Sequence, residues 1–110
     1  MDTRILARLV NGDVRELETL LSDFRSSAQT AADELRVAFA AEDTDGVAAI
    51  AHRLKPSALW VGAMALGELC NAVENTDRTR HGQLEELIGQ LEKELSRVDL
   101  YLAARQASCA

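Results

Sequence analysis

Residues 13–41 read DVRELETLLSDFRSSAQTAADELRVAFAA and carry the strongest structural signal in the chain. Their apolar residues recur at alternating steps of three and four, at Val14, Leu17, Leu21, Phe24, Ala28, Ala31, Leu35 and Ala38. That spacing places the apolar side chains on one face of an α-helix. The register does not slip at Ser26 and Ser27, so the pattern predicts one long helix rather than two. Asp13 is a good N-cap for it, and Glu16 completes a pattern typical of a capping box.

Three more amphipathic segments follow. The first begins after a turn over residues 42–45 and is predicted to end near Gly62. The second is predicted over residues 63–73, and the polar residues 75–82 read as a loop. The last is predicted over about residues 83–104, with apolar positions at Leu84, Leu87, Leu91, Leu95, Val98 and Leu102.

The composition favours helices packed on helices. Apolar residues make up 47% of the 110 residues but aromatic residues only 4%, so the core must be built mainly from leucine, valine, isoleucine and alanine. One-sided apolar faces and short connections predict an all-α fold, an antiparallel up-down four-helix bundle. A short extra N-terminal helix is predicted over residues 3–10. The length suits one domain that covers residues 1–110.

The charge disfavours several classes of partner. A net charge of −6 repels nucleic-acid backbones and anionic membrane surfaces. No apolar run approaches the roughly 20 residues of a membrane span, and the N-terminus lacks a signal-peptide pattern. Cys70 lies on an apolar stripe and Cys109 near the end of the sequence, which does not suggest a disulfide framework or a zinc site. We therefore expect a cytoplasmic domain that contacts neither nucleic acid nor membrane.

His52 is the most informative single residue. The apolar stripe of its helix is formed by Val47, Ile50, Leu54 and Val61, and at about 100° per residue His52 points nearly opposite that stripe. The residues that share its side are Asp45, Ala48, Ala49, Lys55 and Leu59. His52 is thus predicted to be exposed, with a lysine one helical turn away. Without its surroundings, it would read as an ordinary surface histidine.

An exposed imidazole can act as a nucleophile and carry a covalent intermediate near neutral pH. If the group that it carries is a phosphoryl group, the ammonium of Lys55 can stabilise the negative charge. Other chemistries lack their residues, because the sequence has no repeated Glu-x-x-His pair, no glycine-rich phosphate loop and no serine spaced like a hydrolase nucleophile. The exposed face around His52 is therefore the candidate site.

The segment His52-Arg53-Leu54-Lys55, followed by Gly62-Ala63, Leu66, Leu69-Cys70 and Val73-Glu74, resembles the signature of histidine-containing phosphotransfer (Hpt) domains. The resemblance covers nearly the whole chain and implies a monomeric helical bundle without kinase activity. It implies that His52 accepts a phosphoryl group from the aspartyl phosphate of a receiver domain and passes it to another receiver. It also implies that Lys55 assists electrostatically and that Gly62 leaves room near the site. No cofactor is expected, because the Mg²⁺ used in transfer belongs to the receiver.

The expected partners are response-regulator receiver domains, with a hybrid sensor histidine kinase as a further candidate. The residues expected to contact a partner surround His52 and are Ala48, Ala49, Arg53, Pro56, Leu59 and Gly62. Pro56 departs from the family, which has a glycine four residues after the histidine. A proline inside a helix removes the hydrogen bond to the carbonyl four residues earlier, here that of His52. We therefore expect a kink with Pro56 on the outer side.

Two other functions remain open. A helical adaptor could bind a receiver or kinase without carrying phosphate, although His52 and Lys55 on one exposed face argue against it. A dimerising helical bundle is the other, and the lack of a large apolar surface stripe argues against it.

Overall fold

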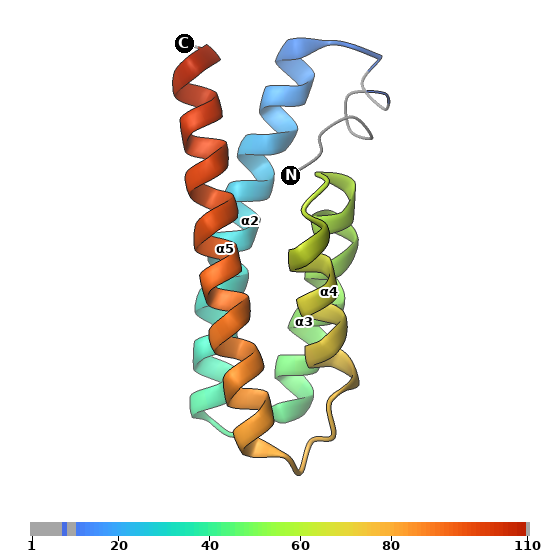
Figure 1. Cartoon of the computed structure of the whole chain (residues 1–110), viewed down its shortest axis with the longest axis vertical. Helices are drawn as coiled ribbons and strands as arrows, with labels where there is room; N and C mark the ends of the chain where they lie inside the picture. Colours follow the sequence, from blue (N-terminus) through green and yellow to red (C-terminus); the bar gives the residue numbers. More distant parts are fainter. Residues whose placement is uncertain (1–7, 9–10, 110) are drawn as a thin grey trace.

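The computed structural model describes residue 8 and residues 11–109 of the chain, and this part is built from α-helices without strands. The helices are α2 (Val14–Ala40), α3 (Thr44–Trp60), α4 (Met64–Asn75) and α5 (His81–Cys109). They run alternately up and down, and α2 and α5 extend beyond the shorter α3–α4 pair (Figure 1). The predicted all-α four-helix bundle is confirmed. The extra helix predicted over residues 3–10 lies, apart from residue 8, outside the described residues.

The sequence sets where the first two helices begin. The Asp13 carboxylate accepts a hydrogen bond from the Glu16 backbone N–H at 3.2 Å, which confirms the predicted cap. The Asp43 carboxylate accepts one from the Gly46 N–H at 2.9 Å and caps α3 in the same way. No break occurs near Ser26, and α2 is one continuous helix.

Both α2 and α3 end in the same type of turn. At the end of α3, Gly62 has a φ of +81°, and the N–H of Ala63 donates to the carbonyl of Ala58 at 2.9 Å. At the end of α2, Glu42 has a φ of +58°, and the N–H of Asp43 donates to the carbonyl of Ala38 at 2.9 Å. Both are Schellman motifs, in which glycine is the usual residue of positive φ. Gly62 therefore reverses the chain between α3 and α4.

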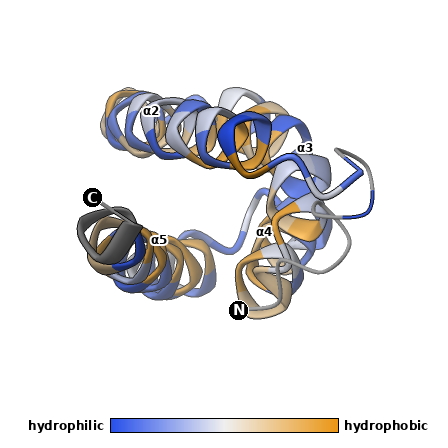
Figure 2. Ribbon diagram, turned by 90° about the horizontal axis from the view of Figure 1, so that it is seen from above, coloured by the Kyte–Doolittle hydropathy of each residue, from blue (hydrophilic) through white to orange (hydrophobic). Residues whose placement is uncertain are grey.

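The core lies where the apolar stripes of the four helices meet. Around the bundle α2 packs against α3 and α5, and α4 packs against α3 and α5 (Figure 2). Among the described residues, the buried set contains apolar residues alone. Its largest fully buried side chains are Leu21, Leu35, Leu66, Leu91, Leu102, Val47, Val73 and Cys70.

Val14, Leu87 and the extent of one loop differ from the sequence-based expectation. Val14 is 64% exposed, because it is the first residue of α2 at the end of the bundle that α3 and α4 do not reach. In α5, Leu87 is only half-buried, and its neighbour Ile88 is buried instead. Leu87 lies three residues after Leu84 and Ile88 lies four residues after it, so both positions fit the helical period. The predicted loop over residues 75–82 is shorter, because α4 continues to Asn75 and α5 begins at His81.

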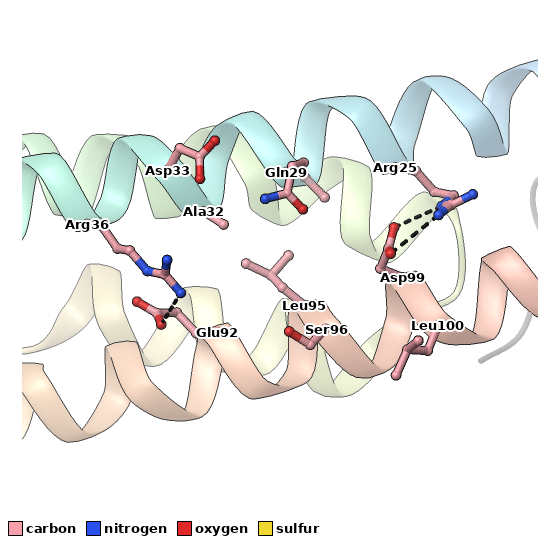
Figure 3. A pocket seen from close by; sticks show the side chains of 11 residues that line it. Arg25, Gln29, Ala32, Asp33, Arg36, Glu92, Leu95, Ser96, Asp99 and Leu100 are labelled. Atoms are coloured by element: carbon pink, nitrogen blue, oxygen red, sulfur yellow. Dashed lines mark hydrogen bonds and ion pairs between the residues drawn. The ribbon is translucent and has the colours of Figure 1, made fainter.

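Polar pairs join the two long helices across their open edge. Arg25 on α2 donates to the Asp99 carboxylate on α5 through Nε at 2.8 Å and through Nη2 at 3.3 Å. Arg36 donates to Glu92 at 3.1 Å further along the same edge. Figure 3 shows the two pairs at either end of a cleft that Leu95 also lines. They hold α2 and α5 on the side of the bundle away from α3 and α4.

Candidate functional site

His52 lies on the outer side of α3, and its side chain is 73% exposed. The opposite side of the same helix places Val47, Ile50 and Leu54 in the core. The predicted exposure of His52 is therefore confirmed, and its cause is the helical period. Pro56 lies inside the same helix with its ring exposed, as expected for the outer side, and the kink itself remains a prediction.

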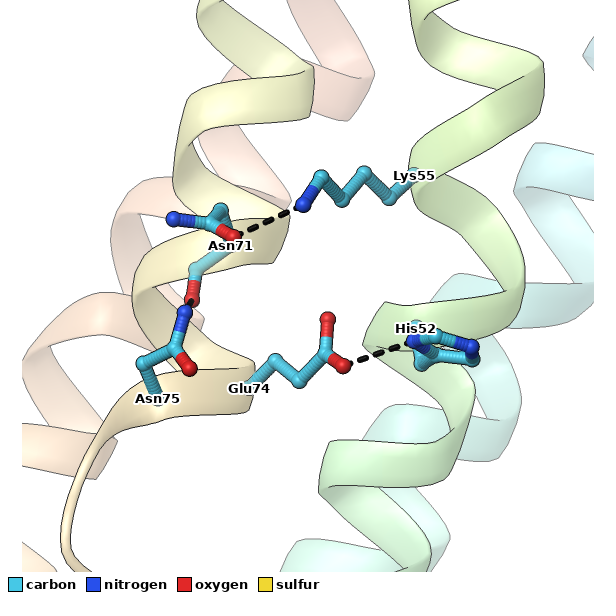
Figure 4. Close-up of polar contacts among 5 residues, drawn as sticks. All are labelled: His52, Lys55, Asn71, Glu74 and Asn75. Carbon is cyan, nitrogen blue, oxygen red and sulfur yellow. Dashed lines mark hydrogen bonds and ion pairs between the residues drawn. The ribbon is translucent and has the colours of Figure 1, made fainter.

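The His52 ring is held by a carboxylate of the next helix. Nδ1 of His52 lies 2.6 Å from Oε1 of Glu74 on α4 (Figure 4). An ionised carboxylate can only accept hydrogen bonds, so this contact requires the proton of a neutral imidazole to be on Nδ1. The lone pair is then on Nε2, the nitrogen that does not face Glu74. The contact thus fixes both the ring orientation and the tautomer suited to nucleophilic attack.

Lys55 reaches across to the same helix one turn away. Its ammonium Nζ donates to Oδ1 of Asn71 at 2.7 Å. The backbone carbonyl of Asn71 in turn accepts a hydrogen bond from the Asn75 amide at 2.8 Å. Figure 4 shows Lys55 and His52 projecting from α3 toward α4, with the two contacts stacked along the helix pair. A cation and an oriented imidazole therefore occupy adjacent turns of one face.

These residues line a shallow groove between α3 and α4. Its volume is about 390 Å³, and its lining is formed by His52, Lys55, Pro56, Leu59, Trp60, Asn71, Glu74 and Asn75. Among these lining residues the ionisable groups are one imidazole, one ammonium and one carboxylate. The carboxylate is bonded to the imidazole, while the ammonium is bonded to a neutral amide. The charge of the Lys55 ammonium is therefore not cancelled by a direct ion pair. The ammonium is thus suited to attract an anionic group that enters the groove.

The side of His52 that faces α4 is more covered than predicted. Ala48 is buried, with 6% exposure, and Leu59 is half-buried against Gly67 of α4. The predicted exposure of Ala48 was therefore wrong, and Leu59 is exposed only in part, where it lines the groove; that either residue contacts a partner stays a prediction. Leu59 lies on the flank of His52 toward which Lys55 also points, and α4 covers that flank. The apolar period of the sequence indicates which side of α3 faces away from the core, but it does not indicate where α4 lies.

The other predicted contact residues divide into two groups. Ala49 and Arg53 are exposed on the flank away from α4, whereas Pro56 is exposed at the edge of the α3–α4 groove. Arg53 also donates to the Glu34 carboxylate of α2 at 2.9 Å, so its guanidinium is partly engaged. Gly62 is buried in the α3–α4 turn, which contradicts a role as a contact surface and explains the glycine by its positive φ.

Asn71 and Glu74 are site residues that the sequence-based selection of candidates missed. A signal for them was present, since both pairs are centred on the turn between the helices. His52 and Glu74 lie eleven residues on either side of Ala63, and Lys55 and Asn71 lie eight residues on either side. In an antiparallel helix pair such positions face one another. Once the turn at residues 62–63 is located, the spacing identifies both partners.

Cys70 lies one residue before Asn71 but belongs to the core. Burial raises the pKa of its thiol to about 11 from an ordinary 9.0, the Glu74 carboxylate adds to the rise, and the Lys55 ammonium opposes it. The thiol is therefore neutral at physiological pH and fully buried. It is not a nucleophile of this site.

A second, more apolar groove lies on the other side of Pro56 and Trp60, between α2 and α3. It encloses about 420 Å³ and is lined by Leu20, Asp23, Phe24, Ser27, Pro56, Ser57, Trp60 and Val61. Trp60 is 57% exposed and borders both grooves. The surface beside His52 thus offers an apolar ridge and groove for contact with another protein.

Comparison with known proteins gives the same interpretation. The family model of the Hpt domain matches residues 19–105. The crystal structure of histidine-containing phosphotransfer protein B (HptB) from Pseudomonas aeruginosa PAO1 is similar, with a TM-score of 0.86 and 25% sequence identity over 98% of this chain and 95% of that chain. No curated protein gives a significant match to the sequence. The family match includes both helices that form the His52 groove.

Proposed function

The chain belongs to the Hpt domain family, and we propose that His52 is the residue on which it carries a phosphoryl group. As a family member it acts in phosphorelay phosphotransfer, as a carrier rather than as an enzyme. The observation that supports His52 most strongly is its contact with Glu74. That contact leaves Nε2 of an exposed side chain with a free lone pair, and the Lys55 ammonium lies on the adjacent turn of α3.

The proposed transfer is a displacement at phosphorus. Nε2 of His52 attacks the aspartyl phosphate of a receiver domain, the N–P bond forms, and the bond from phosphorus to the aspartate oxygen breaks. The receiver regains its carboxylate, and the proton on Nδ1 stays in the hydrogen bond to Glu74. The ring then gains positive charge that the Glu74 carboxylate stabilises, while Lys55 stabilises the phosphoryl oxygens. Reversal of these steps passes the group to another receiver.

The family implies receiver domains as partners. We place the receiver over His52, with its contacts on Ala49, Pro56 and Trp60 and in the apolar groove between α2 and α3. Ala49, Pro56 and Trp60 are exposed on α3, and Asp23 is the acidic residue that lines the groove. The Mg²⁺ of the transfer reaction is assigned to the receiver, because the carboxylate of the His52 groove is already bonded to the imidazole.

We further propose a monomer that works in the cytoplasm, with the receiver of a hybrid sensor kinase among its candidate partners. The monomer is supported by the spread of large exposed apolar side chains over all four helices rather than along one stripe. A helix long and apolar enough to cross a membrane does not occur in the described part of the chain.

The test is phosphoryl transfer from a phosphorylated receiver domain. Acid-labile, base-stable phosphate should appear on the wild-type chain and should be absent from His52→Gln. His81→Gln is the matched control, because His81 is the other histidine of the chain and is exposed at the start of α5. Label that persists in His52→Gln would overturn the assignment. Binding of receivers without any label would favour the adaptor function instead.

A further inference from the structure

Lys55 and His52 use different kinds of partner, although both reach from α3 to α4. His52 contacts a carboxylate, Glu74, whereas the Lys55 ammonium donates to the neutral amide oxygen of Asn71 at 2.7 Å. The backbone of Asn71 is tied in turn by the Asn75 side chain at 2.8 Å. Asn71 therefore holds Lys55 from a fixed position on α4.

The neutrality of Asn71 has an electrostatic consequence. A carboxylate at residue 71 would form an ion pair with Lys55 and would offset the attraction of the ammonium for an incoming anion. An amide oxygen accepts the same hydrogen bond without a net charge. Lys55 is thus held in one of its many rotamers while it keeps its full charge for the groove. A free lysine would have to lose that rotamer freedom during the reaction, at a cost in free energy.

We propose that Asn71 is a positioning residue for phosphoryl transfer, whose uncharged amide holds the Lys55 ammonium in the groove, one helical turn from His52, without neutralising it. This inference rests on the proposed function, because it assigns Asn71 a role in loading the same histidine. Asn71 acts through Lys55 and does not itself touch the phosphoryl group.

The kinetic test uses potassium phosphoramidate, a small donor from which an imidazole nitrogen takes the phosphoryl group as ammonia leaves. The chain carries His81→Gln, so that His52 is the only histidine that can be labelled. We expect Asn71→Ala and Lys55→Ala to slow labelling about three- to tenfold each. The double variant should be no slower than Lys55→Ala alone, because Asn71 acts through Lys55. Gln90→Ala removes an exposed amide from α5 and is the matched control, with no change expected. An Asn71→Ala rate equal to wild type, or effects that multiply in the double variant, would overturn the proposal.

Asn71→Asp separates charge from tethering. The new carboxylate can still accept the hydrogen bond from Lys55, so a purely structural tether would keep its rate. We expect Asn71→Asp to be slower than Asn71→Ala, because its charge cancels that of Lys55 and repels the phosphoryl group. A wild-type rate for Asn71→Asp would show that neutrality does not matter and would contradict the proposal.

A second measurement does not depend on phosphate. Lys55 and Lys93 are the two lysines of the chain, so ¹⁵N-lysine labelling gives one ammonium signal for each. We expect the ammonium protons of Lys55 to exchange with water more slowly than those of exposed Lys93, and Asn71→Ala to remove the difference. Equal exchange in the wild type would overturn the tether. If the tether is present but wild-type His52 takes up no phosphoryl group, the proposed function fails, and the role of Asn71 in transfer fails with it.

Discussion

Nδ1 of His52 on α3 lies 2.6 Å from Oε1 of Glu74 on α4, so the most exposed ionisable group of the groove is oriented by a half-buried carboxylate. The imidazole side chain is 73% exposed and the carboxylate 28%. The Glu74 carboxylate is the less exposed partner of the pair. We therefore infer that α4 supports the His52 ring, and the ring is the part that contacts solvent. The pairing of α3 with α4 therefore sets the direction in which Nε2 points.

Replacement of Glu74 by alanine tests this support. Without the carboxylate the ring loses its orientation and its preferred tautomer, so phosphoryl uptake should slow by about tenfold or more. Single-turnover transfer from a phosphorylated receiver measures the change. Glu68→Ala removes an exposed carboxylate of the same helix and serves as the control. Equal rates for the two variants would show that the His52–Glu74 contact has no kinetic role.

The core should be sensitive to truncation where α4 enters it. Leu66 is fully buried, so Leu66→Ala should lower the free energy of unfolding by ~2–5 kcal/mol. Met64 lies two residues earlier and is 54% exposed, so Met64→Ala should change it by only about 0.5 kcal/mol or less. Urea denaturation followed by circular dichroism compares the two. Similar losses would contradict the placement of the α4 apolar stripe.

The turn after α2 offers a stabilising substitution. Glu42 has a φ of +58° at the Schellman position, where a side chain is strained and glycine is not. Glu42→Gly should therefore raise the free energy of unfolding by about 1 kcal/mol. Glu42→Ala is the control, because alanine keeps a Cβ and so keeps the strain. If thermal unfolding shows no gain for glycine over alanine, residue 42 does not adopt this conformation.

The raised pKa of Cys70 predicts a specific dependence of stability on pH. Its thiol has a pKa of about 11 in the folded chain, mainly through burial, against an ordinary 9.0. The folded state keeps the proton longer than the unfolded state, so this contribution to stability is present below pH 9 and is lost as the pH rises toward 11. The change is ~3 kcal/mol at most.

Cys70→Ala removes the titrating group but leaves the other ionisable side chains in place. The stability advantage of the wild type over this variant should therefore shrink between pH 9 and pH 11, as measured by denaturant titrations at a series of pH values. A constant difference across that range would mean that Cys70 does not ionise on unfolding.

The helices, their order and the exposure of His52 followed from the sequence because a helical period determines which side of a helix is apolar. The same period could not identify the part of the outer side that a neighbouring helix covers. Leu59 is half-buried against Gly67 of α4 for this reason, although it lies on the same side of the helix as His52. Asn71 and Glu74 were missed on the same ground, since their roles depend on the pairing of α3 with α4. Packing also determines that Ile88 rather than Leu87 is buried, because both positions fit the helical period.

The nitrogen that carries the phosphoryl group tests whether Glu74 directs the chemistry of His52. The chain, labelled with ¹⁵N-histidine and loaded by a phosphorylated receiver, can be examined by ¹⁵N and ³¹P NMR. We predict a single phosphohistidine at His52 with phosphorus bonded to Nε2 and a proton retained on Nδ1. Phosphorus on Nδ1 of His52, or on His81, would contradict the account.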